Sequence, residues 1–260
     1  MDDDALAADL VREAGGLAAR MLDAGLDTHF KTSISDVVSA ADHAAEALVA
    51  GRLAAERHDD GLVGEEGART TEGGGTSGRT WYVDPVDGTY NFLSGIPYWC
   101  SAVGLVDHEG PLLGAVYYPA RDELWVGGRG RPTTLNGREL PSLEDRPLAE
   151  VSVATYSNAS HLRDRAKAAS WNAATGAAAT TRMFGSASVD LAGVATGRIG
   201  VFLQANLHPW DWFPGAALVV GAGGVAEEVL LGEQRWLVAG NRQAVAETRA
   251  ALTEAAAAAA

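Results

Sequence analysis

The sequence predicts a layered α/β fold on three observations. In the first 53 residues, apolar side chains recur every three or four positions, which is typical of helices that bury one face. The middle of the chain holds short β-like runs separated by turn residues. After residue 149, strand-like and helix-like patterns alternate, as they do where helices cover a sheet.

Size and charge narrow the class of protein further. The 260 residues are 47% hydrophobic and 21% charged, which is typical of globular proteins. Acidic residues exceed basic ones by 34 − 20 = 14, and such an excess repels nucleic acid and anionic membranes. The acidic N-terminus does not resemble a targeting peptide, and no apolar stretch reaches the roughly 18 residues of a membrane span. With Cys100 as its single cysteine, the protein is expected in the cytoplasm, without nucleic-acid or membrane partners.

Two helices are predicted first, followed by two strands. Apolar stripes run over residues 6–21 and 37–53, and Ser35 or Asp36 is a suitable N-cap for the second helix. The period then becomes extended, which predicts strands at residues 62–64 and 81–83. Acidic residues follow both strands directly. The Gly/Thr/Ser-rich stretch between them is expected to be a surface loop.

The middle of the chain is predicted to form several strands, followed by a linker between two halves of the protein. Strands are predicted at residues 102–106, 112–118 and 123–126, and Asn136-Gly137 predicts a tight hairpin turn. The stretch 143–149, with prolines around it, is predicted to join an N-terminal α+β half, residues 1–145, to a C-terminal α/β half, residues 146–260.

In the second half, strand and helix signals alternate. In the glycine-rich run 215–224, no G-x-G-x-x-G pattern follows a strand, so the run is expected to be a tightly packed helix with a Gly-Gly C-cap and not a nucleotide-binding loop. An Ala-rich helix closes the chain. The other predicted strands are residues 151–154, 182–184, 199–203 and 236–238, and the other predicted helices are residues 161–172, 186–196 and a segment after residue 211.

The segment Asp84-Pro85-Val86-Asp87-Gly88-Thr89 carries the clearest chemical signal. The strand delivers Asp84 to its end, Pro85 is expected to turn the chain away from the sheet, and Asp87 returns beside Asp84. Carboxylates this close repel each other, so a proton or a divalent cation must lie between them. Oxygen ligands of this kind select Mg²⁺ or Mn²⁺. If a helix starts at Gly88 and Thr89, its free N–H groups offer a seat for an anion.

Two other acidic segments argue that this motif is a metal site and not an ordinary solvated turn. Asp-Pro and Asp-Gly are common turn dipeptides, and an isolated pair of aspartates is more often a solvated loop than a metal site. However, Glu65-Glu66 also ends a predicted strand, and Asp211 follows another strand at the start of a helix. Three acidic strand ends favour a single metal-binding cleft.

With these motifs in order, the sequence resembles the inositol monophosphatase family of lithium-sensitive, metal-dependent sugar phosphatases. The resemblance runs from Lys31 to Asn241 and implies a five-layer αβαβα sandwich. It rests on Ser35-Asp36 through Asp42, Gly64-Glu65-Glu66, Asp84-Pro85-Val86-Asp87-Gly88-Thr89-Tyr90-Asn91-Phe92, Leu135-Asn136-Gly137, Gly185-Ser186-Ala187, Val194-Ala195-Thr196-Gly197, Trp210-Asp211 and Gly223-Gly224.

The resemblance implies two Mg²⁺ ions, a weaker third ion helped by Glu65, and Mn²⁺ as a substitute. Glu65, Asp84 and the carbonyl group of Val86 are expected to hold one ion. Asp84, Asp87 and Asp211 are expected to hold the other.

The resemblance also implies how phosphate and water are handled. Gly88 and Thr89 would bind the phosphate through their N–H groups. Asp42 would accept a hydrogen bond from the Thr89 hydroxyl, which helps orient the attacking water, so the expected catalytic residues are Glu65, Thr89 and Asp42. Glu66 is expected behind the ligands, near a metal-bound water.

Ser186, Ala187 and Gln204 are the expected substrate contacts, and here the chain departs from the family. Members that act on inositol phosphates commonly have an Asp and a Glu where this chain has Gly200 and Gln204. Phe213 also occupies a position that is often small. These differences do not affect the predicted metal ligands, but they argue against a preference for inositol phosphates as substrates.

The function that the resemblance implies is an Mg²⁺-dependent phosphomonoesterase, in which water attacks phosphorus in line without a phosphoenzyme. Metal ions suit this chemistry because an ester dianion repels a hydroxide nucleophile. Inositol 1-phosphate is the expected substrate, and homodimers are common in the family. The alternatives are a histidinol-phosphate or fructose-1,6-bisphosphate phosphatase, a 3′-phosphoadenosine phosphatase, and a regulatory binding module that retains the fold.

Overall fold

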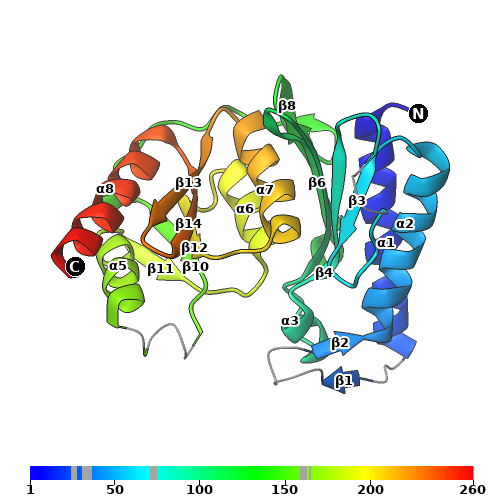
Figure 1. Ribbon diagram of the computed structural model, residues 1–260, viewed down its shortest axis with the longest axis horizontal. Coiled ribbons are helices and arrows are strands. Elements are labelled where there is room, and N and C mark those ends of the chain that lie inside the picture. The colour runs from blue at the N-terminus through cyan, green and yellow to red at the C-terminus, as the bar shows by residue number, and fades with distance from the viewer. Residues whose placement is uncertain (25–27, 31–36, 71–74, 159–162, 164, 260) are drawn as a thin grey trace.

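Helices and sheets alternate in five layers across the molecule (Figure 1). This arrangement confirms the predicted αβαβα sandwich. The computed structural model describes residues 1–24, 28–30, 37–70, 75–158, 163 and 165–259. In order across the molecule, the helical layers are α1 (Asp3–Ala24) with α2 (Ala40–Glu56), α6 (Ala187–Ala195) with α7 (Pro209–Gly221), and α5 (Arg165–Gly176) with α8 (Arg242–Ala259).

The first layer confirms the N-terminal helix and corrects the start of the second. Leu6, Leu10 and Ala14 of the predicted stripe of α1 are buried against the adjoining sheet, whereas Leu17 and Met21 are only half-buried. Helix α2 begins at residue 40 rather than 37, because β2 (Val37–Ser39) pairs antiparallel with β1 (Thr28–Phe30). Two consecutive valines favour extended backbone over a first helical turn. The proposed N-cap at residues 35–36 lies outside the described part of the chain.

The larger sheet has seven strands in the order β3-β4-β5-β6-β7-β8-β9, and only its β3–β4 pair is parallel. The predicted hairpin at Asn136-Gly137 joins β8 to β9, with φ angles of 50° and 77° at the two turn residues. Positive φ at both positions matches a type I′ turn. The strands are β3 (Gly61–Gly64), β4 (Thr80–Asp87), β5 (Cys100–Asp107), β6 (Gly110–Tyr118), β7 (Glu123–Gly128), β8 (Arg131–Leu135) and β9 (Arg138–Glu139).

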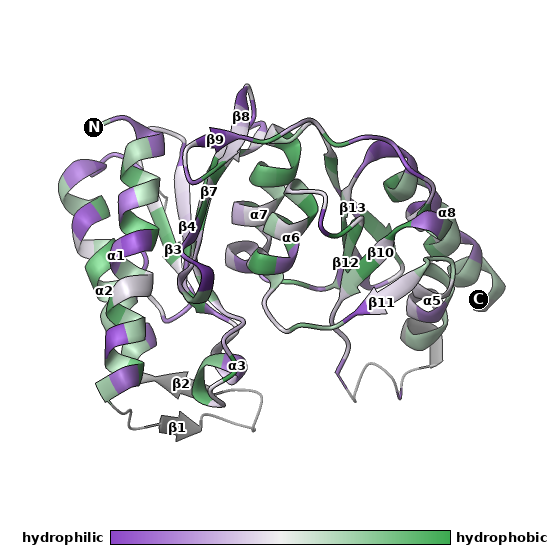
Figure 2. Cartoon of the chain, turned by 180° about the vertical axis from the view of Figure 1, so that it is seen from behind, coloured by the Kyte–Doolittle hydropathy of each residue, from purple (hydrophilic) through white to green (hydrophobic). Residues whose placement is uncertain are grey.

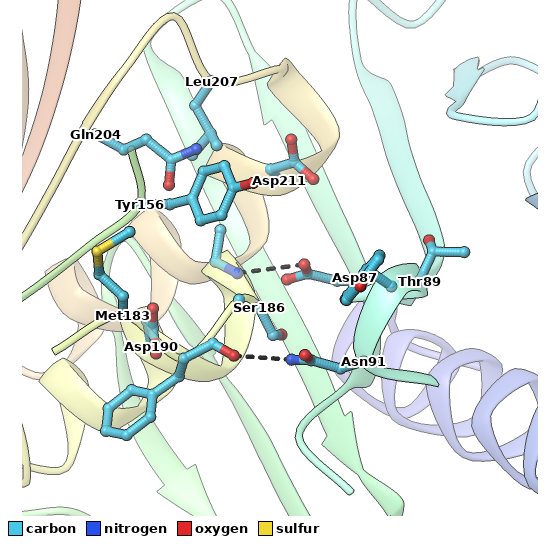
Figure 3. Close-up of a pocket in the computed structure, with 15 residues that line it drawn as sticks. Asp87, Thr89, Asn91, Tyr156, Met183, Ser186, Asp190, Gln204, Leu207 and Asp211 are labelled. Carbon is cyan, nitrogen blue, oxygen red and sulfur yellow. Dashed lines mark hydrogen bonds between the residues drawn. The ribbon is translucent and has the colours of Figure 1, made fainter. Parts of the chain in front are cut away.

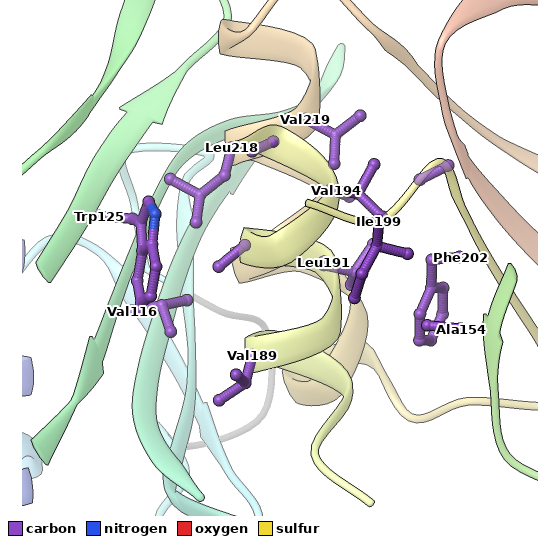
Figure 4. Close-up of a cluster of buried hydrophobic side chains, with 14 of the residues drawn as sticks. Val116, Trp125, Ala154, Val189, Leu191, Val194, Ile199, Phe202, Leu218 and Val219 are labelled. Atoms are coloured by element: carbon purple, nitrogen blue, oxygen red, sulfur yellow. The ribbon is translucent and has the colours of Figure 1, made fainter. Parts of the chain in front are cut away.

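The central helices α6 and α7 are enclosed by both sheets. Hydrophobic colour predominates on them in Figure 2, whereas hydrophilic and hydrophobic patches alternate along α1 and α2. Figure 4 shows Val116 and Trp125 of the larger sheet on one side of α6, and Ala154 and Phe202 of the smaller sheet on the other. A helix between two sheets is apolar around most of its circumference because little of it meets water.

Glycine lets α7 approach the larger sheet closely. A Cβ atom on Gly114 of β6 would lie 1.9 Å from the Pro214 carbonyl oxygen, and one on Gly104 of β5 would lie 2.9 Å from the Pro214 nitrogen. Any larger residue at these positions would push α7 away. This contact matters for the site because α7 carries Asp211 in its first turn.

The smaller sheet has the strand order β11-β10-β12-β14-β13, and its first three strands are parallel. Strand β11 lies two residues before the predicted segment. Strand β13 was not predicted, because two consecutive glutamates interrupt its hydrophobic pattern; as an edge strand it tolerates them. None of the helices among the described residues is long and apolar enough to cross a bilayer. The strands are β10 (Ser152–Thr155), β11 (Thr180–Arg182), β12 (Val201–Ala205), β13 (Val225–Leu231) and β14 (Gln234–Gly240).

Candidate active site

Parallel pairing of β3 and β4 brings the first acidic residues together. Gly64 lies opposite Val83, and the Glu65 N–H donates to the Val83 carbonyl oxygen over 3.1 Å. Glu65 therefore leaves its strand beside Asp84. Glu65 and Asp84 are 19 residues apart in the sequence and become neighbours through this pairing.

A β-bulge aligns Asp84 with Asp87. In the pairing with β5, Asp84 lies opposite Ala102 and Asp87 opposite Cys100, so β4 uses one more residue than its partner. Residues three apart on a regular strand point to opposite faces, and the extra residue restores a common face. The chain therefore does not leave the sheet at Pro85 as predicted. Strand β4 continues to Asp87 through the bulge.

Asp211 completes the acidic cluster from the second half of the chain. It lies in the first turn of α7, after Pro209, and α7 is held on the larger sheet by the glycine contacts. Carboxylate oxygens of Asp84, Asp87 and Asp211 all lie within 4.8 Å of one another.

The three carboxyl groups destabilise one another's charged forms. Burial raises the pKa of Asp84 well above its ordinary value, and the charges of Glu65, Asp87 and Asp211 raise it further. Burial, Asp87 and Glu65 likewise raise the pKa of Asp211. The close approach of the Asp211 side chain raises the pKa of Asp84 further.

This donor set fits a divalent metal ion. Its ligand atoms are all oxygens, and they are crowded enough that a cation would relieve their repulsion. No Lys, Arg or His is among the described residues that line the cleft. A hard cation such as Mg²⁺ is therefore the partner that the chemistry of the cluster favours.

Asp87 is fixed by the N-terminus of α6. Its two carboxylate oxygens accept hydrogen bonds from the backbone N–H groups of Ala187, at 3.2 Å, and Ser188. These bonds lower the pKa of Asp87 and offset part of the rise caused by burial. The Ser186 hydroxyl caps the same helix by accepting from Val189 N–H at 3.4 Å. Ser186 and Ala187, which were expected to contact substrate, line the cleft and also support Asp87.

The expected phosphate seat follows Asp87 directly. Gly88 has φ 98° and ψ 38° and is the N-cap of the short helix α3 (Thr89–Leu93). A Cβ atom on Gly88 would lie 3.1 Å from the carbonyl oxygens of both Gly185 and Tyr98, so the seat requires glycine. The Thr89 hydroxyl donates to the Val86 carbonyl oxygen at 3.1 Å, which makes these two predicted functional groups neighbours.

Asp42 lies in α2, and Glu66 lies in the turn after β3. Asp42 is buried in the first turn of α2, with 1% of its surface exposed. Its hydrogen bond with Thr89 stays a prediction, and so do the roles that the family resemblance implies for the other site residues. The Glu66 carboxylate lies 3.4 Å from Nδ1 of His43, a residue of α2 that the motifs did not indicate.

Sequence reasoning missed Glu46, which organises the turn that carries Glu65. Its buried carboxylate accepts hydrogen bonds of 2.8 Å from the backbone N–H groups of Glu66 and Ala68. A Cβ atom on Gly64 would lie 2.2 Å from a Glu46 oxygen. The signal in the sequence was its position four residues after Asp42, on the same helical face.

Asp87 and Asp211 of the acidic cluster line one side of a cleft of about 760 Å³. Figure 3 shows Tyr156, Met183, Gln204 and Leu207 gathered opposite Asp87. Gln204 lines the cleft as expected, whereas Tyr156 and Met183 were missed, because single residues at loop positions carry no motif.

The two other departures from the family pattern do not line the cleft. Gly200 lies beside Val151, and a Cβ atom there would be 2.2 Å from the Val151 Cβ. Phe213 packs its ring against Tyr82, with ring centroids 4.8 Å apart. Among the departures noted in the sequence, Gln204 is therefore the one that changes the cleft itself.

Comparisons with known proteins agree with this geometry. The model of the "Inositol monophosphatase family" matches residues 2–260. An inositol-1-monophosphatase of Rhizobium meliloti is 38% identical over 193 residues, which cover 73% of this chain and 71% of the relative. The Nus factor SuhB of Xylella fastidiosa is 32% identical over 215 residues, covering 82% and 77%. A crystal structure of the suppressor protein suhB from Bartonella henselae superposes with a TM-score of 0.85 at 28% identity, over 96% and 97% of the two chains.

Proposed function

The chain belongs to the inositol monophosphatase family, a family of phosphatases, and from this premise we propose that it is an Mg²⁺-dependent phosphomonoesterase acting on a small sugar or polyol phosphate. The observation that carries the proposal is the cluster of Asp84, Asp87 and Asp211, whose carboxylate oxygens lie within 4.8 Å of one another next to the Gly88-Thr89 turn. Carboxylate ligands for a cation lie next to backbone N–H groups that can bind an anion. This arrangement suits a phosphate ester that is bound through a metal ion.

Each half of the chain supplies ligands. Asp84, Asp87, Asp211, Glu65 and the Val86 carbonyl oxygen would hold the two Mg²⁺ ions that the family resemblance implies. When bound, Mg²⁺ would lower the pKa of a water, neutralise phosphate charge and stabilise the leaving oxygen.

The protein's own groups position the reactants. The Gly88 and Thr89 N–H groups would bind phosphoryl oxygens, and the glycine at residue 88 leaves room for their approach. The Thr89 hydroxyl donates its proton to the Val86 carbonyl oxygen in this structure. The family resemblance implies that it would donate to Asp42 during catalysis. The N-terminus of α6 fixes Asp87 in the orientation that a ligand needs.

Inositol 1-phosphate is the first substrate to test, with histidinol phosphate and fructose 1,6-bisphosphate as alternatives. Hydrolysis of inositol 1-phosphate and glycerol 2-phosphate should require Mg²⁺, disappear with EDTA and return with excess Mg²⁺ or Mn²⁺. Asp211→Asn should lower kcat/KM by about 100-fold or more. If no phosphate monoester is hydrolysed with either metal ion, the proposed function is wrong.

A second candidate is a regulatory binding module, favoured by the relative named as a Nus factor. It predicts that binding to a partner survives Asp211→Asn while hydrolysis is lost. The cytoplasmic location, the homodimer and the absence of nucleic-acid partners stay predictions from the sequence.

A further inference from the structure

Large apolar side chains that remain exposed are concentrated at the cleft. Seven large hydrophobic residues are exposed in the described part of the chain, and four of them line this cleft: Tyr90, Tyr156, Met183 and Phe184. Their exposed fractions are 54%, 42%, 49% and 39%. Exposed apolar residues that converge on one cavity mark a ligand-binding surface more often than scattered ones do.

The framework holds this apolar surface next to the phosphate seat. The Asn91 side-chain amide donates to the carbonyl oxygens of Tyr98 and Phe184, at 2.8 Å each. The Phe184 ring packs against Tyr98, with centroids 4.9 Å apart. Tyr156 follows the parallel strand β10, and Gln204 lies in its neighbour β12, so both lie where ligands bind in open α/β sheets.

Polar groups are few on this side of the cleft. Gln204 offers one amide and Tyr156 one hydroxyl, and the Asp190 carboxyl already accepts a hydrogen bond of 2.7 Å from the Tyr98 hydroxyl. A polyol would leave several hydroxyl groups facing Met183 and Leu207 without partners, which disfavours its binding. A second phosphate group would find no Lys, Arg or His among the described lining residues.

We propose that the leaving-group side of this cleft selects monophosphates of alcohols that carry an aromatic or heteroaromatic ring. The Tyr156 ring and the Met183 side chain supply the apolar contact, and the Gln204 amide bonds to the edge of the ring. This inference rests on the proposed phosphomonoesterase activity, and it replaces the sugar or polyol of that proposal with an aromatic alcohol as the preferred leaving group.

A matched set of alkyl phosphates tests the inference with the full-length chain and saturating Mg²⁺. We would compare kcat/KM for 2-phenylethyl phosphate and glycerol 3-phosphate, which are both esters of primary alcohols, and for inositol 1-phosphate and fructose 1,6-bisphosphate. The phenylethyl ester should be preferred about 10-fold or more, and the bisphosphate should be the poorest. Tyr156→Ala and Met183→Ala should each raise KM for the phenylethyl ester and change glycerol 3-phosphate little.

The control variant is Leu230→Ala, at an exposed position outside the cleft, which should leave all rates unchanged. The inference is overturned if the polyol ester is preferred, or if the aromatic preference survives in both cleft variants. Those results would leave Mg²⁺-dependent hydrolysis intact. If none of the esters is hydrolysed, the proposed function and the inference fail together.

A separate observation identifies Glu46 as a positioning residue for the metal site. Its carboxylate holds the backbone of Glu66 and Ala68, and Gly64 leaves room for it, so the turn that carries Glu65 rests on Glu46. The structure assigns to Glu46 the task of keeping Glu65 directed at Asp84. Charge-assisted hydrogen bonds to backbone N–H groups are strong enough to set a loop geometry.

The dependence of activity on Mg²⁺ concentration tests this role. Glu46→Gln should raise the Mg²⁺ concentration for half-maximal activity about 10-fold and leave kcat at saturating Mg²⁺ within a few-fold of the parent. Glu56→Gln is the matched control, because Glu56 also lies on α2 and its carboxylate accepts hydrogen bonds from Arg52, away from the turn after β3. An unchanged Mg²⁺ requirement in Glu46→Gln would refute the assignment, even if its thermal stability were reduced.

Discussion

The two sides of the cleft are built in different ways. The acidic side comes largely from one short segment, Asp84 to Thr89, which a bulge and a parallel strand pair hold in place. The apolar side comes from single residues at Tyr156, Met183 and Leu207, which lie in separate segments. Reactivity is therefore encoded locally, whereas substrate choice is spread over the fold and can change without disturbing the metal ligands.

The largest effect should come from breaking the acidic side. Asp84→Asn removes a ligand predicted to serve both metal ions, so kcat/KM should fall by about 1000-fold or more while the apolar side stays intact. In EDTA, the same variant should melt at a higher temperature than the parent, because it relieves repulsion with Asp87 and Asp211. Activity assays and thermal melts check both results. Asp23→Asn, at an exposed position on α1, is the control.

A second test disturbs the packing of α7 against the larger sheet without replacing any of the acidic residues. Gly114→Ala places a methyl group within 1.9 Å of the Pro214 carbonyl oxygen and should cost about 2 kcal/mol or more of unfolding free energy. Because α7 carries Asp211, activity should also fall. Gly51→Ala, with nothing within 4 Å of the new Cβ in α2, should instead stabilise the protein by about 0.5–1 kcal/mol. Urea unfolding measures both changes, and equal effects would contradict the close packing of α7.

The pH dependence of stability sharpens the contrast. Folding raises the pKa of Asp84 and Asp211, and burial raises that of Asp190 to about 8. The folded protein then holds more protons than the unfolded one, so the stability from these groups is complete below about pH 4 and is lost as pH rises through the raised values. Asp60, whose pKa is lowered beside Arg79, acts in the opposite direction and only at acidic pH.

Without metal, the unfolding free energy should therefore fall by at least about 1 kcal/mol between pH 5 and pH 8. With saturating Mg²⁺, the carboxylates of the acidic cluster stay charged and bound to the metal ion. The decrease in unfolding free energy between pH 5 and pH 8 should then be only the part that Asp190 contributes. Urea unfolding at fixed ionic strength in EDTA and in Mg²⁺ measures the difference. Identical slopes in the two conditions would show that the cluster does not bind the ion.

The smallest effect should come from the apolar side. Gln204→Glu adds a carboxylate acceptor for substrate hydroxyls, so the ratio of kcat/KM for inositol 1-phosphate to that for 2-phenylethyl phosphate should rise about 3- to 10-fold. The requirement for Mg²⁺ should not change. A ratio that stays the same would mean that residue 204 does not contact the leaving group.

Several features of the fold could be predicted from the sequence because their signals are local. The helix α1, the strands of the larger sheet and the Asn136-Gly137 turn follow from periodicity and turn chemistry within a few residues. Predictions were wrong where pairing with another strand decides the local structure. Strand β2 precedes α2 because it pairs with β1, and the strand continues through Pro85 because the bulge keeps Asp87 in β4.

The sequence by itself determined which chemistry is available, since a run of aspartates, a glycine and a threonine can hold little but a hard cation and an anion. Only the tertiary structure decided how that chemistry is held and shaped. Glu46 holds the Glu66 N–H group across 20 residues, α6 fixes Asp87 across 100, and the pairing of β10 with β12 brings Tyr156 and Gln204 to one cleft. Such contacts arise when elements pack, and no local pattern of residue types records them.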